Sequence, residues 1–198
     1  MNQSFSMVLM RIVAGQARGR KLIVPKGREV RPTADRVREA LFSMLGSRIS
    51  NARVLDLFAG TGALGLEALS RGAASAVFVE KSKSVRMILK KNITNLGFES
   101  KAGVIPGDAR STLRVLKNDA VKFDVVFLDP PYAGTLLEET LGAIGAQGLL
   151  EQEAFVIAEH PRGEKPVLPK SLRIVATKSY GGTDLSIVEH SGSSTPVT

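Results

Sequence analysis

The chain has 198 residues, of which 43% are hydrophobic and none is cysteine, and its formal net charge is +8. This length and apolar content suit one full-sized domain, and the lack of cysteine excludes disulfide bonds and thiolate metal sites. No apolar run reaches the roughly 20 residues of a membrane span, so we expect a cytoplasmic protein without a membrane segment.

The positive charge is concentrated near the N-terminus. Residues 11–38 carry nine lysines and arginines against two acids, a net charge of +7, whereas residues 39–198 carry only +1. Such clustering is typical of a nucleic-acid-binding surface. Short apolar runs at residues 12–13 and 22–24 predict an ordered basic hairpin rather than a solubilising tail. The candidate phosphate-binding residues are Arg11, Arg18, Arg20, Lys21, Arg31, Arg36 and Arg38.

Four segments are predicted along the chain. Residues 1–10 form a flexible extension, residues 11–50 the basic hairpin and a helix, residues 51–190 the main domain, and residues 191–198 a frayed Ser/Thr-rich tail. Within the second segment, Thr33 is predicted to cap a helix over residues 34–45, where apolar side chains recur at helical spacing.

The main domain alternates between strand and helix patterns. The predicted strands are residues 54–58, 76–80, 102–106, 123–128 and 155–159, and the predicted helices are residues 63–70, 84–96, 109–116 and 136–144. This rhythm indicates an α/β fold with a doubly wound, mostly parallel sheet. Residues 172–177 and 185–189 leave no room for a helix between them, so they predict an antiparallel hairpin at or near the sheet edge.

A glycine-rich turn follows the first predicted strand. Gly60, Gly62 and Gly65 have the GxGxxG spacing of dinucleotide-binding turns, although glycines also suit a tight turn without a ligand. Asp56 lies just before this turn, where a carboxylate would repel a pyrophosphate and attract a cation. S-adenosylmethionine (SAM) carries ammonium and sulfonium cations and no phosphate, which favours SAM over a dinucleotide.

Further acids follow the next two strands. Glu80 suits a ribose diol in either cofactor, and Asp108 can accept from an adenine amine, although each acid could instead cap a helix. Acids at the ends of three successive strands favour one shared site over three caps. The predicted cofactor-binding residues are Asp56, Phe58, Gly60, Gly62, Glu80, Lys81, Asp108, Ala109 and Asp129, and no metal site is expected.

The tetrapeptide Asp129-Pro130-Pro131-Tyr132 follows the fourth strand. Two prolines fix the backbone and remove two N–H donors, which leaves a carboxylate, bare carbonyls and an aromatic ring. That set suits a planar base with an exocyclic amine, because the oxygens accept from the amine while the ring stacks on the base. The alternative is a proline-rich turn that only ends the strand.

These motifs resemble those of SAM-dependent amino-methyltransferases, and most closely the RsmD family, which methylates N2 of a guanine in 16S ribosomal RNA. The resemblance is carried by residues 31–39 (RPTADRVRE), 55–72 (LDLFAGTGALGLEALSRG), 129–132 (DPPY) and 180–183 (YGGT). Gly182 departs from the family pattern, in which an acidic residue is expected.

The resemblance implies a seven-stranded Rossmann-like methyltransferase sheet with a reversed C-terminal hairpin. It implies SAM as cofactor, Asp129, Pro130, Pro131 and Tyr132 as catalytic residues, and a monomer that binds ribosomal RNA, free or within the small subunit, through the basic residues near the N-terminus. The alternatives are an adenine-N6 methyltransferase, a nicotinamide-dependent oxidoreductase, and an RNA-binding protein without activity.

Overall fold

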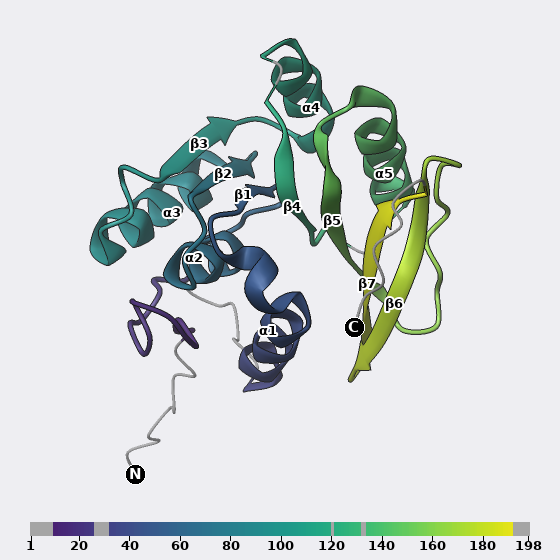
Figure 1. Cartoon of the computed structure of the whole chain (residues 1–198). Helices are drawn as coiled ribbons and strands as arrows, with labels where there is room; N and C mark the ends of the chain where they lie inside the picture. Colours follow the sequence, from purple (N-terminus) through teal and green to yellow (C-terminus); the bar gives the residue numbers. More distant parts are fainter. Residues whose placement is uncertain (1–9, 26–31, 120, 132–133, 192–198) are drawn as a thin grey trace.

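One mixed sheet of seven strands organises the molecule. The computed structural model describes residues 10–25, 32–119, 121–131 and 134–191. The strand order is β3-β2-β1-β4-β5-β7-β6 (Figure 1). The strands are β1 (Arg53–Asp56), β2 (Ser75–Glu80), β3 (Ala102–Pro106), β4 (Phe123–Leu128), β5 (Leu150–Pro161), β6 (Leu172–Tyr180) and β7 (Thr183–His190). The predicted doubly wound α/β fold is confirmed.

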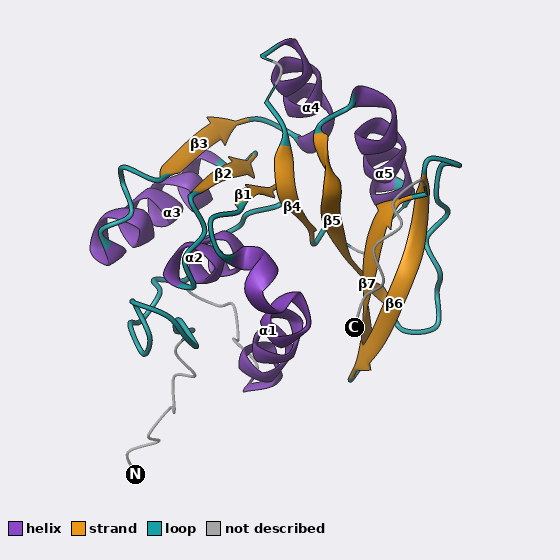
Figure 2. Ribbon diagram, in the orientation of Figure 1, coloured by secondary structure: helices purple, strands orange, loops and turns teal. Residues whose placement is uncertain are grey.

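Helices cover both faces of the sheet (Figure 2). They are α1 (Pro32–Leu45), the short 3-10 helix η1 (Gly46–Ile49), α2 (Ala63–Ser70), α3 (Lys83–Leu96), α4 (Ala109–Asn118) and α5 (Leu136–Gln147). Helices α1, α2 and α3 share one hydrophobic cluster, and α4 and α5 belong to the other. Because strands buried on both faces need apolar side chains in both directions, consecutive residues are apolar at Val54–Leu55 of β1 and at residues 125–128 of β4.

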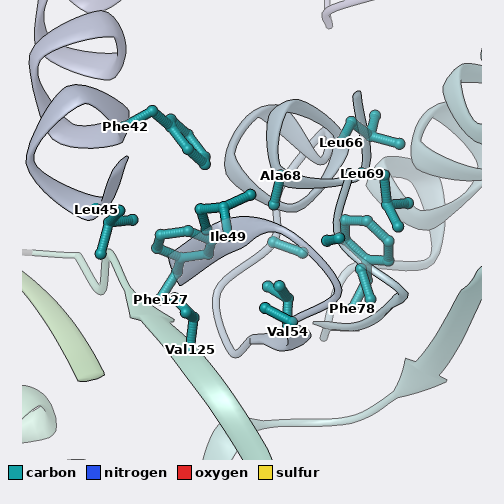
Figure 3. Close-up of a cluster of buried hydrophobic side chains, with 14 of the residues drawn as sticks. Phe42, Leu45, Ile49, Val54, Leu66, Ala68, Leu69, Phe78, Val125 and Phe127 are labelled. Carbon is teal, nitrogen blue, oxygen red and sulfur yellow. The ribbon is translucent and has the colours of Figure 1, made fainter. Parts of the chain in front are cut away.

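Alternation along β4 assigns its side chains to the two layers. Val125 and Phe127 pack on the α1 side, where the rings of Phe42 and Phe127 lie 5.7 Å apart, centroid to centroid (Figure 3). Val126 and Leu128 face α4 and α5. Successive side chains of a strand point to opposite faces of the sheet. The residue after Leu128, Asp129, therefore turns toward α1.

The C-terminal strands form an antiparallel hairpin, as predicted, in which β7 runs against the parallel strands and β6 runs in their direction. β7 pairs antiparallel with both β5 and β6. The two-residue connection between Tyr180 and Thr183 leaves no length for a crossover helix, so the chain must turn back on itself. This turn lies at the edge of the sheet where β5 ends, since Pro161 is the partner of Thr183.

Two local predictions differ from the structure. Helix α1 begins at Pro32, so Thr33 lies inside the helix and is not its N-cap; proline is well suited to the first helical position because its φ is already helical. The two short strands of the basic hairpin reduce to a single antiparallel bridge between Arg11 and Lys21. Residues 1–9 and 192–198, predicted to be flexible, lie outside the described residues.

The N-terminal hairpin is docked on α2 through one buried acid. The side chain of Glu67 is 0% exposed, and its carboxylate accepts hydrogen bonds from the backbone N–H groups of Val13 (2.7 Å) and Ala14 (2.9 Å). It also accepts from Nε of Arg71 at 2.7 Å. The guanidinium of Arg71 lies 4.8 Å from the ring centroid of Phe42 on α1, so α1 contacts the same side chain that binds Glu67.

Side chains of α2 and α3 hold the remainder of the hairpin. The hydroxyl of Ser70 accepts from the backbone N–H of Ala17 at 2.9 Å. The amide of Asn92 makes two hydrogen bonds with the backbone of Ile23, at 2.8 Å and 3.0 Å. Because the bonds are distributed along its length, the hairpin is packed as part of the fold.

No helix in the described part of the chain is long and apolar enough to cross a membrane.

We predict that Glu67→Gln weakens the docking of the hairpin. Glutamine retains one acceptor oxygen, so one of the three donors that face the carboxylate would meet an amide NH2 instead. The free energy of unfolding should fall by about 1–3 kcal/mol, measured by urea denaturation. The amide protons of Val13 and Ala14 should also exchange faster with solvent, while Glu99→Gln, on the exposed surface, should change neither quantity. Equal exchange in Glu67→Gln and the wild type would contradict the role given to this carboxylate.

Candidate functional site

The candidate site lies at the edge of the sheet where the parallel strands end. The strand order reverses between β1 and β4, because the chain continues to β2 on one side of β1 and returns to β4 on the other. Ligands of doubly wound folds bind at this point. Asp56 ends β1, Glu80 ends β2, Asp108 follows β3, and Asp129 follows β4.

Asp56 supports the glycine turn from beneath. Its side chain is only 2% exposed, and its carboxylate accepts a hydrogen bond from the N–H of Gly65 at 3.1 Å. Burial raises the pKa of Asp56 to about 7, although bonds from the backbone N–H groups of Gly65 and Phe58 oppose the rise. This acid therefore satisfies a donor in the first turn of α2, and its carboxylate lies below the surface of the loop.

Glu80 connects two of the predicted cofactor-binding loops. It is half-buried and accepts hydrogen bonds from the N–H of Gly60 (3.0 Å) and the N–H of Ser82 (2.6 Å). These bonds fix the carboxylate where the loops after β1 and β2 meet. A carboxylate has about four acceptor positions, so two backbone donors leave capacity for a ligand hydroxyl.

Two positions of the turn require glycine, each for a different structural reason. Gly62 has a φ of 91° in the left-handed region just before α2, a conformation that favours glycine. A Cβ on Gly65 would lie 2.3 Å from the ring of Phe78 on β2, so only glycine lets α2 pack this closely on the sheet. Gly65 thus serves helix packing, and Gly60 is the residue whose N–H faces Glu80.

Asp108 caps helix α4. Its carboxylate accepts from the N–H of Ser111 at 2.9 Å and from the Ser111 hydroxyl at 2.9 Å, which lowers its pKa. The side chain remains exposed, so the cap does not cover it. Of the other predicted cofactor residues, Phe58 is half-buried, Lys81 is exposed and Ala109 is buried.

A cleft of about 600 Å³ lies on the β5 side of this row of acids. Helix α1, the first turn of α2, the ends of β4 and β5 and the β6–β7 turn form its walls. The lining residues are Met10, Val37, Arg38, Leu41, Ala63, Leu64, Leu128, Asp129, Ile157, Glu159, Tyr180, Gly181, Gly182, Thr183 and Leu185. The cleft is mostly apolar, and Asp129 and Glu159 are the carboxylates among its lining residues.

The Asp129–Tyr132 tetrapeptide is described in part. Asp129 is exposed toward the cleft, Pro130 is buried and Pro131 is exposed. Tyr132 lies outside the described residues, so its predicted stacking on a base stays a prediction.

The basic residues predicted to bind phosphates fall into three groups. Arg11, Arg18, Arg20, Lys21 and Arg36 are exposed. Arg38 is only 4% exposed; its Nη2 donates to the carbonyl of Arg11 (2.6 Å) and to Asp35 (2.7 Å), and the side chain forms part of the cleft wall. Arg31 lies outside the described residues.

Sequence reasoning missed part of the cleft. Val37 and Leu41 gave only a helical apolar stripe, and nothing in that pattern showed that α1 covers the end of β4. Glu159 was noticed only as the end of a predicted strand, although an acid following a buried apolar run was the same signal that identified Glu80. No group of three or more His, Asp or Glu side chains that could hold a metal ion occurs in the described residues.

Comparison with known proteins identifies relatives across most of the chain. The model of a family described as "Conserved hypothetical protein 95" matches residues 10–189. The ribosomal RNA small subunit methyltransferase D of Escherichia coli K12 is 45% identical over 150 residues, covering 76% of this chain and 74% of the relative. The protein of the same name from Haemophilus influenzae is 39% identical over 173 residues, covering 87% and 89%.

Solved structures share the fold. A hypothetical protein of Thermus thermophilus has a TM-score of 0.78 at 36% identity, covering 91% of this chain and 99% of its own. The Escherichia coli protein yhhF, a candidate methyltransferase, has a TM-score of 0.81 at 37% identity, covering 92% and 98%.

We predict that Asp56→Asn removes a pH dependence of stability. The folded-state pKa near 7 exceeds the unfolded value near 4, so between these values the folded protein binds the extra proton. The contribution of Asp56 to the free energy of unfolding is therefore largest at low pH. It declines as the pH rises toward 7, by up to about 1.4 kcal/mol per pH unit. Asparagine keeps the acceptor for Gly65 and does not ionise.

The measurement is urea denaturation at pH 5 and pH 8. Relative to wild type, Asp56→Asn should gain roughly 1–3 kcal/mol of unfolding free energy between these pH values. The exposed Asp119→Asn serves as the control and should follow the wild type. Parallel pH profiles for Asp56→Asn and the wild type would show that Asp56 ionises normally.

Proposed function

Because the chain belongs to the RsmD family, we propose that it transfers a methyl group from SAM to the exocyclic N2 amine of a guanine in small-subunit ribosomal RNA. The observation that carries this proposal is the position of Asp129. It stands at the switch point of the sheet, between the loops predicted to bind the cofactor and a cleft of about 600 Å³.

The loops after β1, β2 and β3 fit SAM by their chemistry. Glu80 retains acceptor capacity for the ribose hydroxyls, and Asp108 presents an exposed carboxylate toward which an adenine amine can donate. The carboxylates of Glu80 and Asp108, at the ends of β2 and β3, disfavour a nearby pyrophosphate, which is the group that distinguishes a nicotinamide dinucleotide from SAM. When bound, SAM supplies an electrophilic methyl group on a sulfonium.

Asp129 and the carbonyl of Pro130 act on the target amine. The lone pair of an exocyclic purine amine is delocalised into the ring, which makes the nitrogen a poor nucleophile. Two acceptors that hold its two hydrogens favour a pyramidal nitrogen whose lone pair points along the line of attack. The contribution of these residues is then mainly positioning, and as the nitrogen is alkylated it releases one proton along its hydrogen bond to the carboxylate of Asp129.

The cleft suits a single unstacked base. Its volume lies within the usual range for small-ligand sites, and Val37, Leu41 and Leu185 offer apolar surface to a ring. A base inside an RNA helix must leave the stack to reach Asp129, at a cost of a few kcal/mol.

The docked N-terminal hairpin would hold the surrounding RNA. Arg18, Arg20 and Lys21 are exposed on a segment that Glu67, Ser70 and Asn92 fix to α2 and α3. Electrostatic contacts to phosphates are independent of sequence and sensitive to salt. The hairpin would therefore supply affinity and orientation, and the cleft would select the base.

Nucleoside analysis of ribosomal RNA tests the proposed reaction. Cells without the protein should lack one N2-methylguanosine in 16S ribosomal RNA, and the wild-type gene should restore it. Asp129→Ala should not restore it, because the amine loses its main acceptor, whereas Asp119→Ala, which removes an exposed acid at the end of α4, should. A missing N6-methyladenosine instead would establish the adenine alternative, and normal methylation by Asp129→Ala would refute the role given to Asp129.

A salt titration tests the RNA-binding surface. Replacing Arg18, Arg20 and Lys21 together by alanine should flatten the log–log dependence of RNA affinity on salt, since each phosphate contact contributes about 0.7–0.9 to the slope. SAM affinity, measured by calorimetry, should stay nearly unchanged. The matched control replaces Lys117, Lys122 and Lys170, which are exposed elsewhere, with the same loss of charge. Equal slopes for the two triple variants would move the RNA-binding surface away from the hairpin.

A further inference from the structure

We infer that Glu159 selects guanine over adenine by accepting a hydrogen bond from N1–H of the target base, while Asp129 accepts from its N2 amine. This inference rests on the proposed function and names the residue that would set base specificity. It follows from the register of β4 and β5, from the face on which both acids lie, and from the hydrogen-bonding edge of guanine.

The register between β4 and β5 places Asp129 and Glu159 at the same height along the two strands. Strands β4 and β5 are parallel, and Leu128 is the partner of Ala158. Asp129 and Glu159 each come one residue later, so they stand side by side, Asp129 directly after β4 and Glu159 two residues before the end of β5. Neighbouring strands in a sheet lie about 4.8 Å apart, which is a suitable separation for two acceptors that read adjacent groups on one base.

Both carboxylates belong to the cleft. On β5, Phe155 and Ile157 pack on the α1 side and Val156 and Ala158 on the other side, so the alternation turns Glu159 toward α1. Asp129 continues the alternation of Phe127 in the same direction. Consistent with this geometry, both acids line the cleft of about 600 Å³.

The position of β5 makes Glu159 a substrate residue. The loops predicted to bind SAM follow β1, β2 and β3, which lie on one side of β4, whereas β5 lies on the other side. Asp129 stands at the boundary between the two halves. Glu159, near the end of β5, therefore faces the substrate that enters next to the cofactor, under the wall formed by α1 and the β6–β7 turn.

Guanine presents two adjacent donors, N1–H and the N2 amine, on its Watson–Crick edge. Two adjacent carboxylates match that edge. Adenine presents an amine beside N1, which is an acceptor, so the lone pair of adenine N1 would face the carboxylate of Glu159 with no proton between the two acceptors. Sites built to bond one polar pattern reject the mismatched one strongly, because a buried polar group is left unpaired.

The experiment compares guanine with 2-aminopurine at the target position. 2-Aminopurine keeps the amine at C2 but has an unprotonated N1 and no oxygen at C6. The effect of the missing oxygen is common to all enzyme variants, so a change in the ratio between variants reports the contact to N1. Small-subunit RNA is joined by ligation so that the mapped target carries either base, and it is assembled with ribosomal proteins where the wild type requires this. The wild type should methylate guanine at least tenfold faster than 2-aminopurine.

Glu159→Gln should invert part of this preference. Its amide NH2 can donate to N1 of 2-aminopurine, so the ratio of 2-aminopurine to guanine methylation should rise about tenfold or more. Glu153→Gln is the matched control, because it makes the same change on the same strand outside the cleft. SAM affinity of Glu159→Gln, measured by calorimetry, should match the wild type and verifies that the variant is folded.

The outcomes separate this inference from the proposed function. Equal rates on the two bases for the wild type would overturn the role of Glu159, whether or not the variant folds. So would an unchanged ratio in a folded Glu159→Gln. Absence of N2 methylation of guanine by the wild type would instead refute the proposed function.

Discussion

The parallel arrangement of β1 to β5 is the constraint on which the site depends. Parallel strands joined by helical crossovers all end at the same edge, so residues far apart in the sequence reach one place. The reversal of strand order between β1 and β4 opens the crevice there. The acids that follow β1, β2 and β3 lie on one side, and the cleft between α1 and β5 lies on the other. Asp129 borders both regions, because β4 lies next to β1 at the reversal and next to β5 at the cleft.

Burial gives these acids different functions although their chemistry is the same. Asp56 is enclosed beneath the glycine turn, its pKa is raised, and it stabilises the start of α2. Asp108 is exposed and has a lowered pKa, because donors at the start of α4 favour its charged form. Glu80 joins two loops, and Asp129 is exposed toward the cleft. Solvent access therefore separates Asp56, which is enclosed and can only support the fold, from the acids whose carboxylates remain accessible to a ligand.

The N-terminal segment is coupled to the cleft through the same layer of side chains. Glu67 binds the backbone of the hairpin and Arg71, and Arg71 lies over Phe42 of α1. Arg38 of α1 in turn donates to the carbonyl of Arg11 and lines the cleft. The exposed cations of the hairpin are thus held in a fixed relation to the wall of the cleft. In the proposed function, long flexible side chains on this rigid segment would adapt to phosphates while the cleft holds the base.

The sequence by itself determined the α/β class, the elements of the main domain, the reversed hairpin and the row of acids at strand ends. These features depend on local periodicity and on turn residues, which act over a few positions. The tertiary structure decided which acids are buried, because the burial of Asp56 depends on how α2 packs on β1 and β2. It also decided that α1 covers the cleft, that Arg38 is a wall residue, and that Glu159 stands beside Asp129. Those two acids are 30 positions apart in the sequence, and only the pairing of β4 with β5 brings them together.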